Sequence, residues 1–261
     1  MRWAFNVYKC YVRISFSSAV AYRADFIFTL FISLLSNLLV PLLTALIYMN
    51  GASIPGWTFA EALMIQSVFM LCVGICAPLF SNMVWITMQH IREGTYDIIL
   101  LRPGPAAFLT AACAFDIGDI GMLIGGLVMF VYSVLNLTNP PGMAEWLQFA
   151  LLGFMGLCMA LGCILLMAAS TFKWVGNGRI YEIFDAVTMF GRYPSAIFTR
   201  TIQGISAYIL PVAMMGYFPA AAVMGRANAQ MLLACFPCAG FLLIGCLVFN
   251  RMIHMYQSAG G

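Results

Sequence analysis

Long apolar stretches separated by short polar connections dominate the pattern along this chain. Continuous apolar runs extend over residues 26–49, 58–89, 107–135, 146–172 and 229–250. A helix rises 1.5 Å per residue, so about 20 apolar residues cross the ~30 Å hydrocarbon core of a bilayer. Each run reaches that length, and the pattern therefore predicts helices that span a membrane.

The first 25 residues follow a different, amphipathic pattern. At the helical spacing of 100° per residue, Arg2, Asn6, Lys9, Arg13 and Ser17 fall on one narrow face, and apolar or aromatic residues cover the rest. A helix of this kind lies in the membrane interface with its basic face toward anionic head groups. A solvated helix that packs on a partner is the alternative.

The segment 174–226 allows two interpretations. In the first, residues 178–196 form the fifth span and residues 197–226 return into the outer leaflet as a re-entrant pair of short helices. In the second, residues 203–224 form the span and residues 178–200 form a cytoplasmic amphipathic helix.

Hydropathy and proline content favour opposite interpretations of that segment. The absence of charge between residues 203 and 224 favours the second. Pro194, Pro211 and Pro219 favour the first, because each removes a backbone donor and disfavours helix just before it. Irregular backbone at membrane depth must be buried in protein, which a hairpin packed against other helices achieves.

Composition agrees with a chain that lies mostly in lipid. Of 261 residues, 63% are hydrophobic and only 8% are charged, and the mean hydropathy is +0.96. A soluble domain carries roughly 25% charged residues. The net charge of +3 is too weak and too scattered for a nucleic-acid-binding protein. We expect an interfacial helix over residues 1–25 and a single transmembrane domain over residues 26–261.

Cationic residues are distributed unequally between the two sides. With both termini inside, the inner side carries Arg2, Lys9, Arg13, Arg23, Arg92, Arg102, Lys173, Arg179 and Arg251. The outer side carries Arg226, together with Arg192 and Arg200 if their segment faces out. By the positive-inside rule, this asymmetry predicts six spans with both termini in the cytoplasm.

Motifs for catalysis, metal binding and nucleotide binding are absent from the sequence. The two histidines, His90 and His254, have no ligand partner at helical spacing, and no Gly-x-Ser-x-Gly motif occurs. A phosphate-binding loop requires Gly-Lys followed by Ser or Thr, and neither Lys9 nor Lys173 follows a glycine. The sequence therefore predicts a protein that is no enzyme and that holds neither metal nor cofactor of its own.

The connection after the second apolar run has the character of a docking element. Arg92, Glu93, Asp97 and Arg102 mix both charge signs around Gly94, and two prolines end the segment. A short helix with this pattern suits a groove on a soluble partner. An ordinary polar turn explains the pattern equally well.

Two acidic residues lie inside the third apolar run. Asp116 and Asp119 are three residues apart and would share one face of a helix. Charges within a span are costly and often mark a transport path. Residues 118–137 alone are long enough to span, however, so a local structural role near the interface is the favoured interpretation.

At these same residues the sequence resembles the permease subunits of type-2 ABC exporters, in particular a bacterial subgroup of such permeases. The matching segments, in order along the chain, are residues 21–26 (AYRADF), 91–97 (IREGTYD), 100–103 (LLRP), 190–194 (FGRYP), 209–213 (ILPVA), 217–220 (YFPA) and 256–260 (YQSAG).

The resemblance implies an all-α membrane protein of the bacterial cytoplasmic membrane. It implies six transmembrane helices, an N-terminal interfacial helix and a re-entrant extracellular helical hairpin before the last helix, which favours the first interpretation of residues 174–226. It also implies a dimer with a second related permease or a copy of itself, and two separately encoded ATPase subunits that bind ATP and magnesium. The Arg92–Arg102 connection would be the coupling helix.

The expected cargo is an amphipathic, drug-like or lipid-like molecule, neutral or cationic, that moves outward between the first, second and fifth spans. Tyr193, Tyr208, Tyr217 and Phe218 would lie near the exit, where aromatic faces attract organic cations, and the two aspartates near the entrance. An interfacial aromatic belt is the alternative for these rings. For the whole protein, the alternative is a secondary transporter or channel without an ATPase, which predicts charges in mid-span and inverted repeats.

Overall fold

The computed structural model describes residues 2–118, 120–174 and 179–256, and throughout these residues the chain is helical with connecting turns. The prediction of an all-α fold is confirmed for this part of the chain. In order, the elements are α1 (Arg2–Ala21), α2 (Arg23–Met49), α3 (Phe59–Cys76), the π-helical turn η1 (Ala77–Ser81), α4 (Asn82–Arg92), α5 (Asp97–Leu100), α6 (Ala106–Cys113), α7 (Ile120–Leu135), α8 (Met143–Thr171), α9 (Arg179–Thr188), the 3-10 turns η2 (Met189–Arg192) and η3 (Ser195–Ile197), α10 (Arg200–Gly204), the π turn η4 (Ile205–Ile209), the 3-10 turn η5 (Val212–Met215), α11 (Tyr217–Val223), α12 (Ala229–Leu233) and α13 (Cys235–Ile253).

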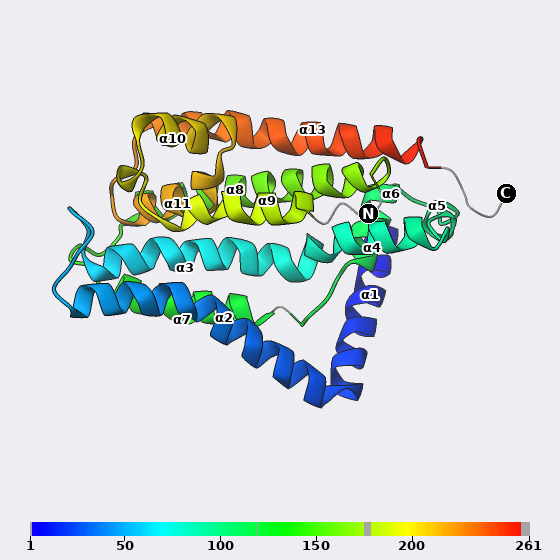
Figure 1. Cartoon of the computed structure of the whole chain (residues 1–261), viewed down its shortest axis with the longest axis horizontal. Helices are drawn as coiled ribbons and strands as arrows, with labels where there is room; N and C mark the ends of the chain where they lie inside the picture. The colour runs from blue at the N-terminus through cyan, green and yellow to red at the C-terminus, as the bar shows by residue number, and fades with distance from the viewer. Residues whose placement is uncertain (1, 119, 175–178, 257–261) are drawn as a thin grey trace.

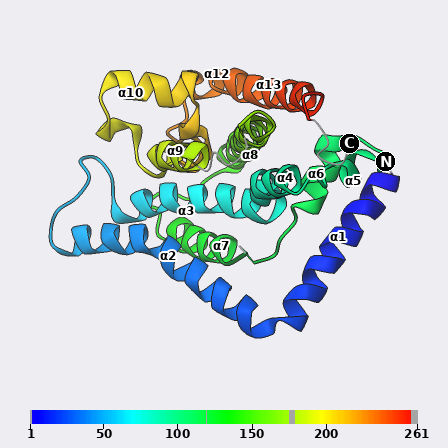
Figure 2. The same ribbon diagram turned by 45° about the vertical axis from the view of Figure 1, so that its right-hand side comes forward.

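The long helices form a bundle along the horizontal axis of Figure 1, and α1 runs across that axis. The start of α1, the α4–α6 region and the end of α13 lie at one end, which we name the terminal end (Figures 1 and 2). The α2–α3 connection and the short helices α10 and α11 lie at the opposite, distal end.

Four helical stretches are long and apolar enough to cross a membrane. They are Arg23–Met49, the continuous stretch Phe59–Arg92, Met143–Thr171 and Ala229–Ile253, and a shorter apolar helix covers Ile120–Leu135. These helices correspond to five of the predicted spans. Lipid is therefore the natural solvent of the bundle.

Glycines allow the closest contacts between the helices. A Cβ atom at Gly245 of α13 would lie 2.6 Å from the carbonyl oxygen of Gly162 in α8. A Cβ atom at Gly74 of α3 would lie 2.7 Å from the amide nitrogen of Leu123 in α7. Apolar side chains gain little by leaving lipid for a protein interior, so close backbone packing at small residues is what joins membrane helices.

Two prolines shape the helices of the N-terminal half. Pro41 lies inside α2, and one turn later the Thr44 hydroxyl donates to the carbonyl of Val40 and accepts from Nε2 of the buried Gln66 at 2.7 Å. Pro78 lies in η1, between α3 and α4. A proline cannot donate to the preceding turn, and π turns accommodate such defects without ending the helix.

The predicted span 107–135 is divided in the structure. Helix α6 ends at Cys113, α7 begins at Ile120, and the residues described between them are not helical. The Asp116 carboxylate accepts the amide of Gly118 at 2.9 Å, and the Asp116 amide donates to the Pro78 carbonyl at 3.0 Å. Local side-chain bonds of this kind compete with helical hydrogen bonds, and apolarity alone does not reveal them.

Residues 179–223 form several short helices and turns and not one long helix. Helix α9 and turn η2 run from the terminal end toward the distal end, and the pieces from η3 to α11 gather at the distal end (Figure 1). Pro194 and Pro211 lie at breaks between these pieces. Turn η5 and helix α11 are enclosed by protein, since Met214 and Ala221 are fully buried, whereas Ile197 of η3 and Ile209 of η4 are exposed. Irregular backbone at membrane depth requires such enclosure, which η5 has.

Candidate functional site

The connection at the terminal end is a compact folded loop. Helix α4 ends at Arg92, and Gly94 takes a left-handed conformation with φ +66°, which glycine adopts without steric cost. The Thr95 amide donates to the carbonyl of His90, and Nδ1 of His90 lies 2.7 Å from the Thr95 hydroxyl oxygen. The short helix α5 follows, so the predicted hinge at Gly94 coincides with a real turn.

Tyr96 anchors this loop to the bundle. Its side chain is fully buried, its hydroxyl lies 3.0 Å from the Thr110 hydroxyl of α6, and its ring packs edge-on against Phe172 and Tyr256. Burial raises the pKa of the Tyr96 phenol to about 12. The sequence pattern did not predict this anchor, although Tyr96 is an aromatic residue at the centre of a polar connection.

The rest of the connection presents a mixed polar and apolar surface. Arg92, Glu93 and Arg102 are exposed, Asp97 is partly buried, and Leu101 is 84% exposed. The charged residues predicted for a docking element therefore lie on one short loop, with an exposed leucine between them. Such a surface offers both salt links and an apolar anchor to a partner.

Helix α1 is fastened to the same connection. The Arg102 guanidinium donates to the Tyr11 hydroxyl, which also accepts from the Cys113 thiol at 3.0 Å. The Trp3 ring lies 6.3 Å from the Phe108 ring and covers the α-carbon of Gly104 closely. Arg102 thus joins α1 to the connection by a contact within the chain, in addition to its predicted role at a partner surface.

A polar cleft of about 440 Å³ separates α1 and α2 from the residues before α7. Asp25, Asn82 and Asp116 line it, and Nδ2 of Asn82 donates to the Asp116 carboxylate at 3.3 Å. Asp119 lies outside the described residues. The contacts of Asp116 are those of a residue that caps a turn.

Three of the four predicted exit aromatics gather at the distal end. Tyr208, Tyr217 and Phe218 line one cavity of about 330 Å³, whereas Tyr193 is not part of its lining. The Tyr208 hydroxyl donates to the Gln230 carbonyl at 3.3 Å. The Tyr217 ring packs against both Trp57 and Phe218.

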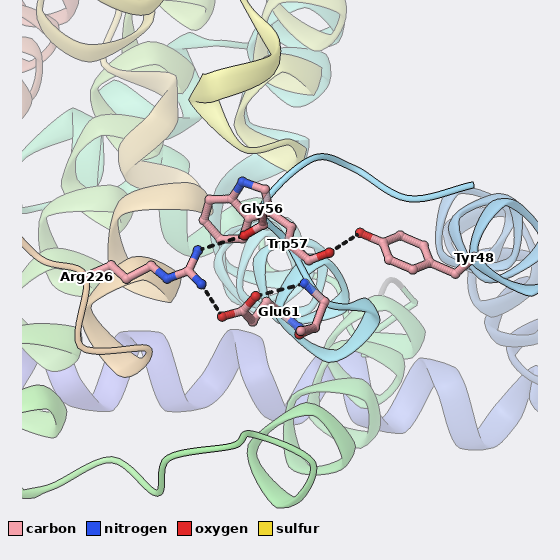
Figure 3. A network of polar contacts seen from close by, with 6 residues as sticks. Tyr48, Gly56, Trp57, Glu61 and Arg226 are labelled. Atoms are coloured by element: carbon pink, nitrogen blue, oxygen red, sulfur yellow. Dashed lines mark hydrogen bonds and ion pairs between the residues drawn. The ribbon is translucent and has the colours of Figure 1, made fainter. Parts of the chain in front are cut away.

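A group that we name the distal clamp, consisting of Tyr48, Trp57, Glu61 and Arg226, joins this region to α2 and α3 (Figure 3). The Arg226 guanidinium forms an ion pair with Glu61 and lies 4.5 Å from the centre of the Trp57 ring. The Tyr48 hydroxyl donates to the Trp57 carbonyl at 2.9 Å. The sequence did carry one signal of this site, the Thr-x-x-Glu capping pattern that places Glu61 in the first turn of α3.

Arg192 departs from its expected place. The sequence places it with Arg200 and Arg226 at the outer surface, but in the structure it is only partly exposed and its guanidinium lies 4.8 Å from the centre of the Phe69 ring of α3. Turn η2 continues α9 and directs Arg192 toward α3. The charge spacing of the sequence cannot show this, because it depends on where α9 packs.

Comparison with protein families gives a match over most of the chain. A family model described as an ABC-2 family transporter protein matches residues 32–260, which is almost the whole bundle and includes the 92–105 connection. No curated protein and no solved structure matches the chain.

Proposed function

This chain belongs to the ABC-2 family of transporter proteins, and we propose that it is the transmembrane permease subunit of an ATP-binding cassette exporter. Membership makes it a membrane component of a transport system and not an enzyme. The observation that supports the finer proposal is the folded, charged 92–105 connection, which projects from the bundle on a buried tyrosine.

The proposed membrane arrangement has six spans. Five are formed by α2, α3 with α4, α7, α8 and α13, and the fifth along the chain begins with α9 and η2 and is completed by the short pieces that follow at the distal end. Successive members of this series run in opposite directions along the bundle, so the start of α1 and the end of α13 lie at the same end (Figure 1). The excess of Lys and Arg in the connections of that side supports its assignment to the cytoplasm of a bacterial cell. Helix α1 crosses the bundle axis, which suits an interfacial helix over residues 1–25 beside the 26–261 domain.

The energy source is proposed to be a pair of separate ATPase subunits that bind ATP and magnesium. The chain has no Gly-Lys-Ser or Gly-Lys-Thr sequence with which to hold a nucleotide itself. The Arg92–Arg102 surface would dock on one ATPase, and the second would dock on a partner permease, either a related chain or a second copy of this one. Closure of the ATPases would then rock the two permease halves.

The proposed cargo is an amphipathic, drug-like or lipid-like molecule that moves outward. The cavity lined by Tyr208, Tyr217 and Phe218 lies at the distal end, where such a molecule would leave. The hairpin from η3 to α11 encloses that cavity together with residues of α12. No ligand chemistry beyond amphipathicity follows from this cavity.

Co-purification tests the proposal. Replacement of Glu93 and Asp97 together by Arg should abolish capture of the ATPase by the tagged permease, because reversed charges in a desolvated docking surface cost on the order of 2–5 kcal/mol. Glu145→Arg in the first turn of α8, at the distal end, is the control and should leave capture unchanged. Normal capture and transport-linked ATP hydrolysis in the double variant would favour a secondary transporter or channel instead.

A further inference from the structure

Arg192 lies at about the middle of the expected membrane thickness. Its guanidinium contacts the ring of Phe69, which is ten residues after Phe59, the first residue of α3 at the distal end. At 1.5 Å per residue the contact is about 15 Å from that end, and the hydrocarbon core is ~30 Å thick. A cation at this depth is costly and is retained chiefly where it has a function.

Contacts within the described residues do not satisfy the Arg192 guanidinium. Its Nε atom is buried and has no hydrogen-bond partner there. The ion pair found in the described part of the chain is that of Arg226 and Glu61, so Arg192 forms none there. A guanidinium has five N–H donors and no acceptor, and the face of Phe69 offsets only part of its desolvation.

The unpaired guanidinium borders a small cavity. The cavity has a volume of about 50 Å³ and is enclosed by α3, α8, α9 and η5. One water molecule needs roughly 10–15 Å³ of such space, so the cavity has room for a few waters or for one carboxylate or phosphate group. Besides Arg192, its lining includes Asp185 and Thr188 of α9 and is otherwise mainly apolar.

We propose that Arg192 binds the anionic head group of an amphipathic ligand within the membrane. Planar guanidinium donors match the oxygens of a carboxylate or phosphate, which is the chemistry that would complete the Arg192 hydrogen bonds. This inference rests on the proposed function and narrows its cargo to an anionic amphiphile. An anionic cargo differs from the neutral or cationic cargo expected from the sequence.

A neighbouring apolar cavity supplies space for the tail. It has a volume of about 260 Å³ between α3 and α8, and residues such as Leu71, Phe154 and Leu157 line it. Met215 lines both this cavity and the one at Arg192. An alkyl chain fits this lining, so the occupant is an amphiphile with an anionic head and not a free inorganic anion.

Asp185 is the other charged group at the Arg192 cavity. It lies seven residues earlier on α9, which places it nearer the terminal end on the same side of the helix. Its carboxylate repels an anion and attracts the guanidinium when the cavity is empty. Removal of the Asp185 charge should therefore maintain or strengthen anion binding, whereas removal of the Arg192 charge should abolish it.

Binding to the purified chain in phosphatidylcholine nanodiscs tests the proposal without an ATPase. The probes are decyl phosphate and decanol, and the readouts are titration calorimetry and the thermal unfolding midpoint. We expect the wild type to prefer decyl phosphate by about 10- to 100-fold, the range that a charge-assisted hydrogen bond supplies. Arg192→Gln should lose this preference, Arg192→Lys should retain part of it, and Asp185→Asn should retain or increase it.

Arg251→Gln is the matched control, because Arg251 is an exposed arginine near the end of α13 that lines none of the cavities described above and should not affect the preference. Repetition with phosphatidylglycerol in the nanodiscs identifies the source of the anion. Suppression of the Arg192-dependent binding would assign the site to a resident lipid, and unchanged binding would assign it to a mobile cargo. Equal preference in wild type and Arg192→Gln, with both folded, would overturn the proposal. A failure of ATP-driven transport alone would refute the proposed function and leave the anion site intact.

Discussion

At the scale of single residues, a few polar side chains determine how the two ends of the bundle are held. Tyr96 contacts α6, the end of α8 and Tyr256 with one side chain. Glu61 and Arg226 join two segments that are 165 residues apart in the sequence. Each bond is short-ranged, yet each connects elements that the chain itself separates.

The phenol of Tyr96 predicts a pH dependence of stability. Its pKa is about 12 in the folded protein against 10.0 as the ordinary value, so the unfolded chain releases this proton first as the pH rises. The neutral phenol contributes fully to the free energy of unfolding below pH 10. This contribution falls by about 2–3 kcal/mol as the pH rises from 10 to 12. Tyr96→Phe should lack this loss, and it should cost about 1 kcal/mol at pH 8 through the bond to Thr110.

Thermal unfolding in nanodiscs between pH 8 and pH 12 measures the difference between wild type and Tyr96→Phe. Tyr22→Phe is the control, because the Tyr22 ring is 70% exposed. Parallel curves for wild type and Tyr96→Phe over this pH range would contradict the prediction.

The ion pair of the distal clamp predicts a measurable coupling. In a double-mutant cycle of Glu61→Gln and Arg226→Ala, we expect an interaction of about 1 kcal/mol, since the pair is only partly exposed to solvent. Arg200→Ala combined with Glu61→Gln is the control cycle and should show additive effects. An interaction near zero for Arg226, measured by thermal unfolding, would mean that the pair contributes nothing to the clamp.

At the scale of elements, packing at glycines decides how the helices meet. Helices α8 and α13 approach where Gly162 and Gly245 face one another, and α3 and α7 approach at Gly74 and Gly126. Helices α8 and α13 also carry glycines with open space around them, Gly153 and Gly240. Sequence cannot separate the two classes, because both lie in equally apolar runs.

Gly245 and Gly240 of α13 form a matched pair for testing this packing. A Cβ atom at Gly245 would lie 2.6 Å from a backbone oxygen of α8, whereas nothing lies within 4 Å of one at Gly240. Gly245→Ala should destabilise the protein by about 1–3 kcal/mol. Gly240→Ala should be neutral or stabilising by up to about 1 kcal/mol, because alanine favours helix. Equal thermal unfolding midpoints for the two variants would show that the α8–α13 contact is looser than described.

At the scale of the whole molecule, the arrangement of α9 and the distal pieces predicts accessibility. Single cysteines at positions 200 and 226, in a background without native cysteines, should react with an impermeant thiol reagent added outside intact cells. A cysteine at position 192 should not react, since this residue contacts Phe69 inside the bundle. Reaction at position 192 in intact cells, or at position 200 only after permeabilisation, would contradict the proposed arrangement.

The sequence by itself determined the class of the molecule and the extents of its long helices. The predicted runs 26–49, 146–172 and 229–250 agree closely with α2, α8 and the α12–α13 stretch. Prediction of these helices from the sequence succeeds because the length of an apolar run is set by the lipid that surrounds it, and because each such helix satisfies its own backbone hydrogen bonds. The amphipathic pattern of the first residues predicted α1 for the same reason.

Tertiary structure alone decided the break in the third run, the course of residues 179–223 and the contact of Arg192 with Phe69. The break depends on a bond between Asp116 and Pro78, and Arg192 lies beside Phe69 because α9 packs against α3. Likewise, Tyr96 became an anchor only when α6, α8 and the C-terminal region met around it. Hydropathy describes how a side chain interacts with its solvent. The helix break, the Arg192 contact and the Tyr96 anchor depend instead on which distant residues replace that solvent in the folded chain.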